Sequence, residues 1–336
     1  MKLKKKTILV YSDPAGYNII SSLIDDFIAN KKIYNIDFKV FTNNEGIINE
    51  EYSPFVEIIN NSLSEVENEI DKFCPDKILT ATSTNIFEHL WRISSKKRKI
   101  RVESYVDHWT GIRKRFSFLN ELVYPDKIYL INDEAKKIAE EEGIPKEIIS
   151  INKNPYYKKV KKFKPEISKA EFLLDLKISK KQKILLYISD NIKNTTCFND
   201  LGFNELSIFE NLTRSLKIIQ ESKKIINKDQ IIILIKLHPR ESKKKYLNLI
   251  KKYEFLNIRI IKQYNPLVIN LYSDIVVGTF SNMVIEAYIL KKTLLRVQIG
   301  IKKEDPLRYE PLKGKFISTQ RELNLELEKM TNQLFN

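Results

Sequence analysis

Three histidines occur in the 336-residue chain, and one of them, His238, follows an apolar run that is typical of a buried strand. The segment IIILIKLHPR carries Lys236, His238, Pro239 and Arg240 at its end. At a strand tip an imidazole can hydrogen-bond a phosphate or donate a proton to a leaving phosphate, while Lys236 and Arg240 add positive charge. Pro239 restricts how the chain leaves the strand. The segment predicts an anion site, and the alternative is a histidine that caps the following helix.

A second candidate site is the segment DIVVGTFSNMVIEA, in which a strand passes into a helix through Gly278. The hydroxyls of Thr279 and Ser281, and the amides of the helical turn that begins near Asn282, are suited to bind a phosphate. Glu286 follows among apolar residues, and an acid in a buried helix usually has a partner, here a ribose or sugar hydroxyl. The alternative is that Ser281 is only an N-cap and Glu286 a solvated charge.

The first apolar run of the chain leads into the loop YSDPAGYN, where a helix is expected to begin. Such a loop exposes backbone N–H groups that can bind an anion, and Asp13 and Gly16 lie in it. The alternative is a tight turn in which Asp13 caps the helix. Both interpretations place Asp13 at the end of a strand.

The segment ESYVDHWTG brings Asp107, His108 and Trp109 together at the end of another expected strand, and Arg115 follows. A carboxylate, an imidazole and an indole suit a site that deprotonates a sugar hydroxyl while the sugar ring rests on the indole. The alternative is an ordinary ion-paired surface loop.

Strand-like and amphipathic segments alternate along the chain, which predicts parallel sheets in a layered α/β fold. The alternation stops over residues 152–168, where prolines and lysines indicate an exposed linker, and then restarts. We expect two facing Rossmann-like domains, 1–158 and 159–320, with ligands outside the carboxyl ends of the strands, and a C-terminal helix over 321–336. Strands are expected at 6–11, 36–41, 56–59, 77–80, 100–106, 127–131, 147–151, 183–188, 230–237, 258–262, 274–277 and 293–297, and helices at 18–29, 63–73, 87–94, 133–142, 209–226, 242–253, 266–271, 281–290 and 321–334.

Composition fits a globular protein, with 43% hydrophobic and 30% charged residues. The opening MKLKKKTILV lacks the cleavage site of a signal peptide, and no apolar stretch reaches the length of a membrane span, so a cytoplasmic location is expected. The two cysteines, Cys74 and Cys197, lie too far apart for a metal motif and indicate neither a disulfide framework nor a zinc site. No clustered acidic metal motif occurs, and no cofactor is expected.

The net charge of +15 is unevenly distributed. Residues 1–160 carry 25 Lys and Arg against 24 Asp and Glu, whereas residues 161–336 carry 33 against 19. Such a basic half suits nucleic acid, an anionic membrane face or an anionic small ligand. Without an aromatic–basic signature, nucleic acid is not expected as a partner, and many of the lysines are expected only to solvate helix faces. Peripheral contact with an anionic membrane remains open.

The pattern K-x-H-P, followed about forty residues later by G-T-x-S-x-x-x-x-E-A, resembles the second domain of GT-B glycosyltransferases. It is most similar to the bacterial sialyltransferase, polysialyltransferase and capsule Kdo-transferase group. The resemblance implies that His238 contacts the phosphate of a nucleotide donor and acts as an acid. It further implies that Thr279 and Ser281 bind phosphate and that Glu286 holds hydroxyls of the donor.

These observations predict a metal-independent glycosyltransferase that moves a CMP-activated acidic sugar to a glycan or lipid-linked acceptor in capsule or lipopolysaccharide synthesis. Asp107 is the first candidate for the catalytic base and Asp13 the second. Two alternatives stay open. One keeps the fold but changes the chemistry to that of a sugar-nucleotide epimerase or a polyol-phosphate transferase. The other is a non-catalytic adaptor whose basic half binds membrane or RNA.

Overall fold

The computed structural model describes residues 4–30, 33, 35–83, 85–109, 111–194, 200–223, 229–311 and 314–335. The chain divides into two compact units, Met1–Lys159 and Val160–Asn336. Each is a layered α/β structure with a parallel sheet, so the expected fold class is confirmed. Cys197 lies outside the described residues, and Cys74 is an exposed free thiol. Of the helices in the described ranges, none is long and apolar enough to cross a bilayer.

The first unit is built on a parallel sheet with the strand order β3-β2-β1-β4-β5-β8-β9. The order reverses between β1 and β4, which pair with each other and each begin one half of the sheet. In sheets of this kind ligands bind at the carboxyl ends of the strands beside the reversal point. The strands are β1 (Lys5–Val10), β2 (Ile36–Thr42), β3 (Val56–Ile58), β4 (Lys77–Thr80), β5 (Arg101–Tyr105), β8 (Lys127–Leu130) and β9 (Ile149–Ile151).

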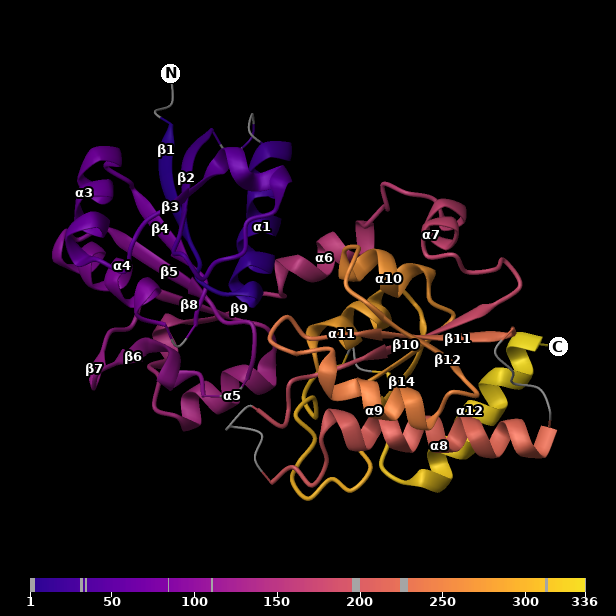
Figure 1. Ribbon diagram of the computed structural model, residues 1–336. Helices are drawn as coiled ribbons and strands as arrows, with labels where there is room; N and C mark the ends of the chain where they lie inside the picture. Colours follow the sequence, from indigo (N-terminus) through magenta and orange to yellow (C-terminus); the bar gives the residue numbers. More distant parts are fainter. Residues whose placement is uncertain are drawn as a thin grey trace. The chain divides into compact units, whose positions relative to one another are not determined.

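Helices cover both faces of this sheet (Figure 1). Apolar residues of α1 pack on one face together with Leu9 and Leu79, while α3 and α4 pack on the other with Ile8 and Ile78. Neighbouring strand residues therefore serve opposite cores, as the pleat requires. The remaining elements of the unit are α1 (Pro14–Ala29), η1 (Glu50–Phe55), α3 (Leu63–Phe73), α4 (Ile86–Lys97), η2 (Arg113–Phe116), the hairpin β6 (Ser117–Phe118) and β7 (Glu121–Leu122), α5 (Asp133–Glu141), and η3 (Lys146–Ile148).

The second unit repeats the plan with the strand order β12-β11-β10-β13-β14-β15, all parallel. Here the order reverses between β10 and β13. The elements are α7 (Lys169–Asp175), β10 (Lys183–Ile188), α8 (Glu205–Lys223), β11 (Ile231–Lys236), α9 (Lys244–Lys252), β12 (Asn257–Ile261), α10 (Pro266–Tyr272), β13 (Ile275–Gly278), α11 (Asn282–Ile289), β14 (Thr293–Val297), β15 (Lys315–Ile317) and α12 (Gln320–Phe335).

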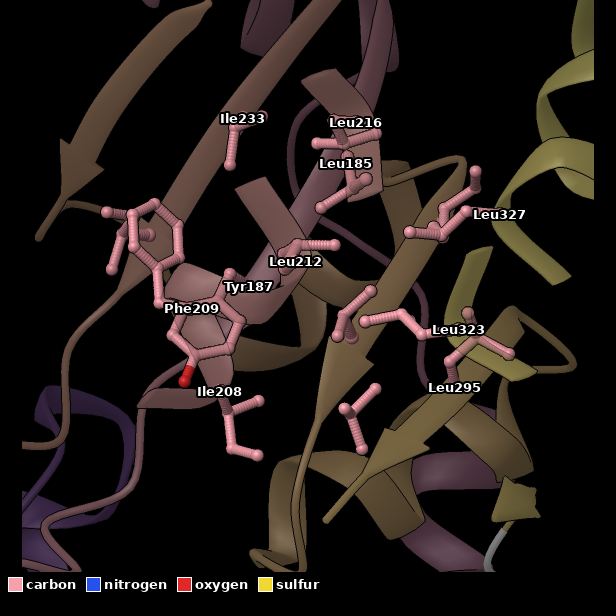
Figure 2. Packing of buried hydrophobic residues seen from close by; sticks show 14 of the residues in the cluster. Leu185, Tyr187, Ile208, Phe209, Leu212, Leu216, Ile233, Leu295, Leu323 and Leu327 are labelled. Carbon is pink, nitrogen blue, oxygen red and sulfur yellow. The ribbon is translucent and has the colours of Figure 1, made fainter. Parts of the chain in front are cut away.

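One core of the second unit lies between its sheet and the helices α8, α9 and α12. Leu212 and Leu216 of α8 meet Leu323 and Leu327 of α12 over the strands, and all four are fully buried (Figure 2). The helices α10 and α11 cover the opposite face (Figure 1). The C-terminal helix is therefore an integral layer of this unit.

Several expected elements differ from the observed ones. The 152–168 segment was expected to be an exposed linker, but it contains α6 (Pro155–Lys162), whose Val160 is fully buried. Pro155 supplies the fixed φ suited to a first helical turn, so the proline that indicated a linker opens a helix instead. The helix α1 begins at Pro14 rather than near residue 18 for the same reason, with Asp13 as its cap. Both α7 and β15 were not expected from the sequence.

Candidate functional site

The carboxyl ends of β10 and β13 meet where the strand order of the second sheet reverses. Asp190 follows β10 and is 6% exposed, and it accepts hydrogen bonds from the Thr279 hydroxyl and, at 3.5 Å, from the Phe280 N–H. Burial raises the pKa of Asp190 to about 6, the charge of Glu241 adds to this, and the Thr279 bond opposes it. Asp190 was not predicted from the sequence, although an acid just after a buried strand can indicate a site residue.

Thr279 is itself fully buried and its hydroxyl is engaged with Asp190. It therefore holds the loop between β13 and α11 in place, and its expected contact with phosphate stays a prediction. Gly278 is required by close packing, because an added Cβ would lie 2.7 Å from the Val284 side chain and 3.3 Å from Cβ of Ile188. A side chain at Gly278 would force this loop away from the sheet.

The first turn of α11 presents polar groups from a second side of the loop. Ser281 occupies the N-cap position with extended backbone, but its hydroxyl makes no capping bond. That hydroxyl is buried and outside hydrogen-bonding geometry, yet it lies close enough to Asp190 to lower the pKa of the carboxyl. Asn282 begins the helix and is exposed. The Ser281 hydroxyl and the backbone amides at the start of α11 are groups of a kind suited to an anion.

Glu286 lies deeper in the same helix and is 5% exposed, so it is not the solvated helix charge of the alternative interpretation. The Asn270 amide of α10 donates to its carboxylate at 3.4 Å and to the Met283 carbonyl at 3.0 Å. The carboxylate thus lies at the contact between α10 and α11. Its role with donor hydroxyls remains a prediction.

His238 follows β11, the neighbour of β10 in the sheet. Its Nδ1 accepts a hydrogen bond from the Arg240 N–H at 3.2 Å, so a neutral ring carries its proton on Nε2. Burial lowers the pKa of His238 below 6.5, and the charges of Arg240 and Lys245 oppose that of Glu241. At pH 7 the residue is a neutral Nε2–H donor. The alternative interpretation, in which the imidazole caps the following helix, is therefore wrong, because Nδ1 accepts the Arg240 N–H within the turn instead.

The other basic residues of this strand tip differ in exposure. Lys236 is half-buried, burial lowers its pKa, and its ammonium donates to the Lys262 carbonyl at 3.4 Å. Pro239 and Arg240 are exposed. Arg240 is therefore an exposed cation close to His238 in the sequence.

In the first unit, Asp13 lies in the turn that follows β1 and caps α1 by accepting the Gly16 N–H at 2.6 Å. Burial raises the pKa of Asp13 to about 6, and the nearby charge of Asp107 adds to the shift. Gly16 has no room for a side chain, because an added Cβ would lie 2.8 Å from Cβ of Ala81. The structure thus brings together the two acids that were the candidate bases.

Asp107 forms an ion pair with Arg115 at 3.0 Å, and the same guanidinium nitrogen of Arg115 donates to the Thr82 carbonyl at 3.0 Å. Trp109 was expected to offer its indole to a sugar ring. The structure contradicts this expectation, because Trp109 is 1% exposed and the His108 ring stacks on it at 4.3 Å between centroids. The indole is a core residue that supports the loop.

Glu88 of α4 is the residue of this edge that the sequence analysis missed. Its fully buried carboxylate accepts hydrogen bonds from Ser12 at 2.8 and 2.9 Å and from Ser83 at 2.8 Å. These serines follow β1 and β4, so the three residues lie at the reversal point of the sheet. Burial raises the pKa of Glu88 to about 7, and the charge of Asp13 adds to it. In the sequence, Glu88 stands among largely apolar residues, and this pattern could have indicated a buried acid.

The first unit therefore holds a carboxyl cluster, Asp13, Glu88 and Asp107, at the carboxyl edge of its sheet. Two of its members have a pKa near 6 or 7, where a carboxyl can both release and take up a proton at neutral pH. Across the described ranges, no group of three or more His, Cys, Asp or Glu residues is arranged to hold a metal ion.

The two-unit arrangement of parallel sheets is a GT-B-like fold. Neither a family model nor a curated protein sequence matches the chain. Solved structures do match.

A UDP-GlcNAc 2-epimerase from Methanocaldococcus jannaschii has 16% identity and a TM-score of 0.62, with 98% of this chain and 94% of that chain covered. A UDP-GlcNAc 2-epimerase from Neisseria meningitidis, bound to UDP-GlcNAc, has 13% identity and a TM-score of 0.64, with the same coverage of 98% and 94%. The S. aureus protein MnaA, solved with UDP, has 14% identity and a TM-score of 0.62, with 98% and 89% covered.

These neighbours overturn the family resemblance inferred from the sequence. The M. jannaschii and N. meningitidis neighbours are UDP-GlcNAc 2-epimerases rather than sialyltransferases or Kdo-transferases, so the predicted CMP-sugar glycosyltransferase is wrong. The physical reason is that short patterns such as K-x-H-P and G-T-x-S describe strand ends of a phosphate-binding α/β unit, which several chemistries share. The neighbours favour the epimerase that the sequence analysis left open as an alternative.

Proposed function

We propose that the chain is an enzyme that acts on a UDP-activated sugar and inverts the configuration of a sugar carbon, as a sugar-nucleotide epimerase. The observation that carries the proposal is the carboxyl cluster. Inversion at the carbon next to the one that carries the nucleotide can proceed by loss of a proton from one face, while the C–H electron pair forms a double bond and expels the nucleoside diphosphate from the neighbouring carbon. The diphosphate then adds back, and a proton returns on the other face. Asp13 and Glu88, with pKa values of about 6 and about 7, are suited to exchange protons at neutral pH.

The second unit supports the binding half of the proposal. A nucleoside diphosphate needs hydrogen-bond donors and positive charge, and this unit provides the His238 Nε2–H, the first turn of α11 and Arg240. The surplus of positive charge in residues 161–336 adds long-range attraction for such an anion. Neighbours of the same fold were solved with UDP and with UDP-GlcNAc.

A donor screen tests the binding half. Thermal shift of the purified full-length chain should rise with UDP and UDP-GlcNAc at concentrations where CMP and CDP have little effect. In His238→Ala the UDP-dependent shift should shrink, because one donor to the phosphates is lost. Stabilisation by CMP alone, or an equal shift in His238→Ala, would contradict the proposal.

The expected location and the peripheral contact with an anionic membrane remain predictions, and they are separable from catalysis. Flotation of the full-length chain with vesicles of anionic and of neutral phospholipid tests the membrane contact. Recovery with the anionic vesicles alone, lost at high salt, is the result that electrostatic contact predicts.

A further inference from the structure

The loop that carries His238 is closed by one buried side chain, Glu241. The Glu241 carboxylate accepts a hydrogen bond from the backbone N–H of His238 at 2.8 Å. The backbone N–H of Glu241 donates in return to the His238 carbonyl at 2.9 Å. Within this closed turn the Arg240 N–H points at Nδ1 of the imidazole. The turn therefore determines which ring nitrogen is an acceptor and which carries the proton.

A buried carboxylate needs compensation, and Glu241 has it from three elements. Its side chain is 0% exposed. It pairs with Lys245, in the first turn of α9, and it accepts the Ser189 hydroxyl at 2.9 Å from the end of β10. The Ser189 hydroxyl is also 2.5 Å from the Tyr246 hydroxyl. The His238 turn is thus tied to the end of the neighbouring strand β10 and to the helix α9.

Lys245 is shared with a second buried acid. It lies 2.5 Å from the carboxylate of Glu205, whose side chain is 1% exposed and which also accepts the Lys193 N–H at 3.1 Å. One ammonium therefore serves two carboxylates that stand in nearly dry surroundings. Such an arrangement is costly to desolvate and is maintained only where the groups are well hydrogen-bonded.

We propose that Glu241 is the positioning residue for His238: it closes the turn that keeps the Arg240 N–H on Nδ1, so that the neutral ring carries its proton on Nε2, aimed at a phosphate oxygen of the nucleotide. Nothing in the strand pattern or in the neighbours assigns this role. The inference rests on the proposed function for the identity of the ligand, but the state of the ring is a property of the protein alone. No group is transferred in this step, and the imidazole only donates a hydrogen bond.

The two parts of the inference have separate readouts. Nitrogen-15 NMR of the histidine rings, with His238 assigned from His238→Ala, should show Nδ1 unprotonated and Nε2 protonated in the wild-type chain above pH 7. In Glu241→Gln the pKa of His238 should fall further below its wild-type value, because the negative charge that raises it is gone. The two tautomers should also mix, and the affinity for UDP should fall about tenfold, the effect of losing one charge-assisted bond.

Glu210→Gln is the matched control. Glu210 pairs with Lys252 at 2.5 Å on the exposed side of α8, so the variant makes the same change of charge away from the loop. It should leave the His238 spectrum and the UDP affinity at their wild-type values.

Three results would overturn the positioning role. They are a wild-type ring protonated on Nδ1, a His238 spectrum that is identical in Glu241→Gln and wild type, and an equal change in Glu210→Gln. If Glu241→Gln does not fold, a wild-type ring protonated on Nδ1 would still overturn the role. Absence of UDP binding by the wild-type chain would instead refute the proposed function, while the ring spectrum would continue to test the role of Glu241.

Discussion

The Thr279 hydroxyl donates a hydrogen bond to the Asp190 carboxylate and so joins the ends of β13 and β10 where the second sheet reverses its order. Because this carboxyl is buried, its pKa of about 6 lies above the ordinary value of 3.8. The folded state thus holds the proton more tightly than the unfolded chain. Stability contributed at this position is present at low pH and is lost as the pH rises from about 4 to about 6.

Thr279→Val should enlarge this loss. The Thr279 bond lowers the pKa of Asp190, so its removal raises the pKa further and extends the loss of stability above pH 6. Urea unfolding should give a penalty of about 1–2 kcal/mol at pH 5 and a larger one at pH 8. Thr213→Val is the control, because the buried Thr213 hydroxyl donates to the Phe209 carbonyl and not to an acid. An equal penalty at both pH values for Thr279→Val would count against the assignment.

In the carboxyl cluster of the first unit, two variants should shift the pKa of Glu88, and with it the pH dependence of stability, in opposite directions. The charge of Asp13 raises the pKa of Glu88 and the Ser83 hydroxyl lowers it. Asp13→Asn should therefore reduce the loss of stability that the wild-type chain suffers between about pH 4.5 and pH 7, whereas Ser83→Ala should enlarge it and extend it above pH 7. Asn still caps the helix well, which keeps the first variant conservative. Urea unfolding at pH 5 and pH 8 measures both, and changes of the same sign would refute the coupling.

Gly278→Ala should destabilise the second unit by about 1–3 kcal/mol, because the new methyl group overlaps the Val284 side chain. The double variant with Val284→Ala removes that side chain and should recover part of the loss. Chemical denaturation of the single and double variants gives the coupling energy between the two sites. Strict additivity would show that steric contact with Val284 is not the cause.

The C-terminal helix offers a matched pair of leucines. Leu323 and Leu325 lie two positions apart in α12, but Leu323 is fully buried and Leu325 is 56% exposed. Leu323→Ala should lower the unfolding free energy by about 2–5 kcal/mol, and Leu325→Ala by less than about 0.5 kcal/mol. Similar losses for both variants would mean that α12 does not pack on the second sheet in solution.

Much of the fold was predictable, because long periodic segments of the sequence specify it. The strands at Lys77–Thr80, Lys183–Ile188 and Thr293–Val297 were predicted to the residue. In these segments buried runs of branched residues end at turn-forming or charged positions, which leaves little ambiguity. The 152–168 segment misled the prediction, because the burial of Val160 depends on tertiary contacts that periodicity does not record.

The site was less predictable than the fold. His238, Ser281 and Asp13 were predicted as site residues because they follow strands closely, and their roles stay predictions. Glu88 and Glu241 were not predicted, since each contacts distant strand ends from a helix or turn. Glu88 is 76 residues from Ser12, and Glu241 is 52 residues from Ser189. Only the sheet order reveals such pairs. The reaction itself was mispredicted, because phosphate-binding strand ends serve many chemistries.

Proton exchange at the sugar is the most direct test of the central proposal. The full-length chain is incubated with UDP-GlcNAc in deuterium oxide, and proton NMR follows the signal of the hydrogen at C2. We expect this signal to disappear as deuterium enters and the C2 epimer to form. We also expect Asp13→Asn and Glu88→Gln to slow the exchange by about 100-fold or more. Retention of the C2 hydrogen by UDP-GlcNAc that binds the wild-type chain would contradict the account.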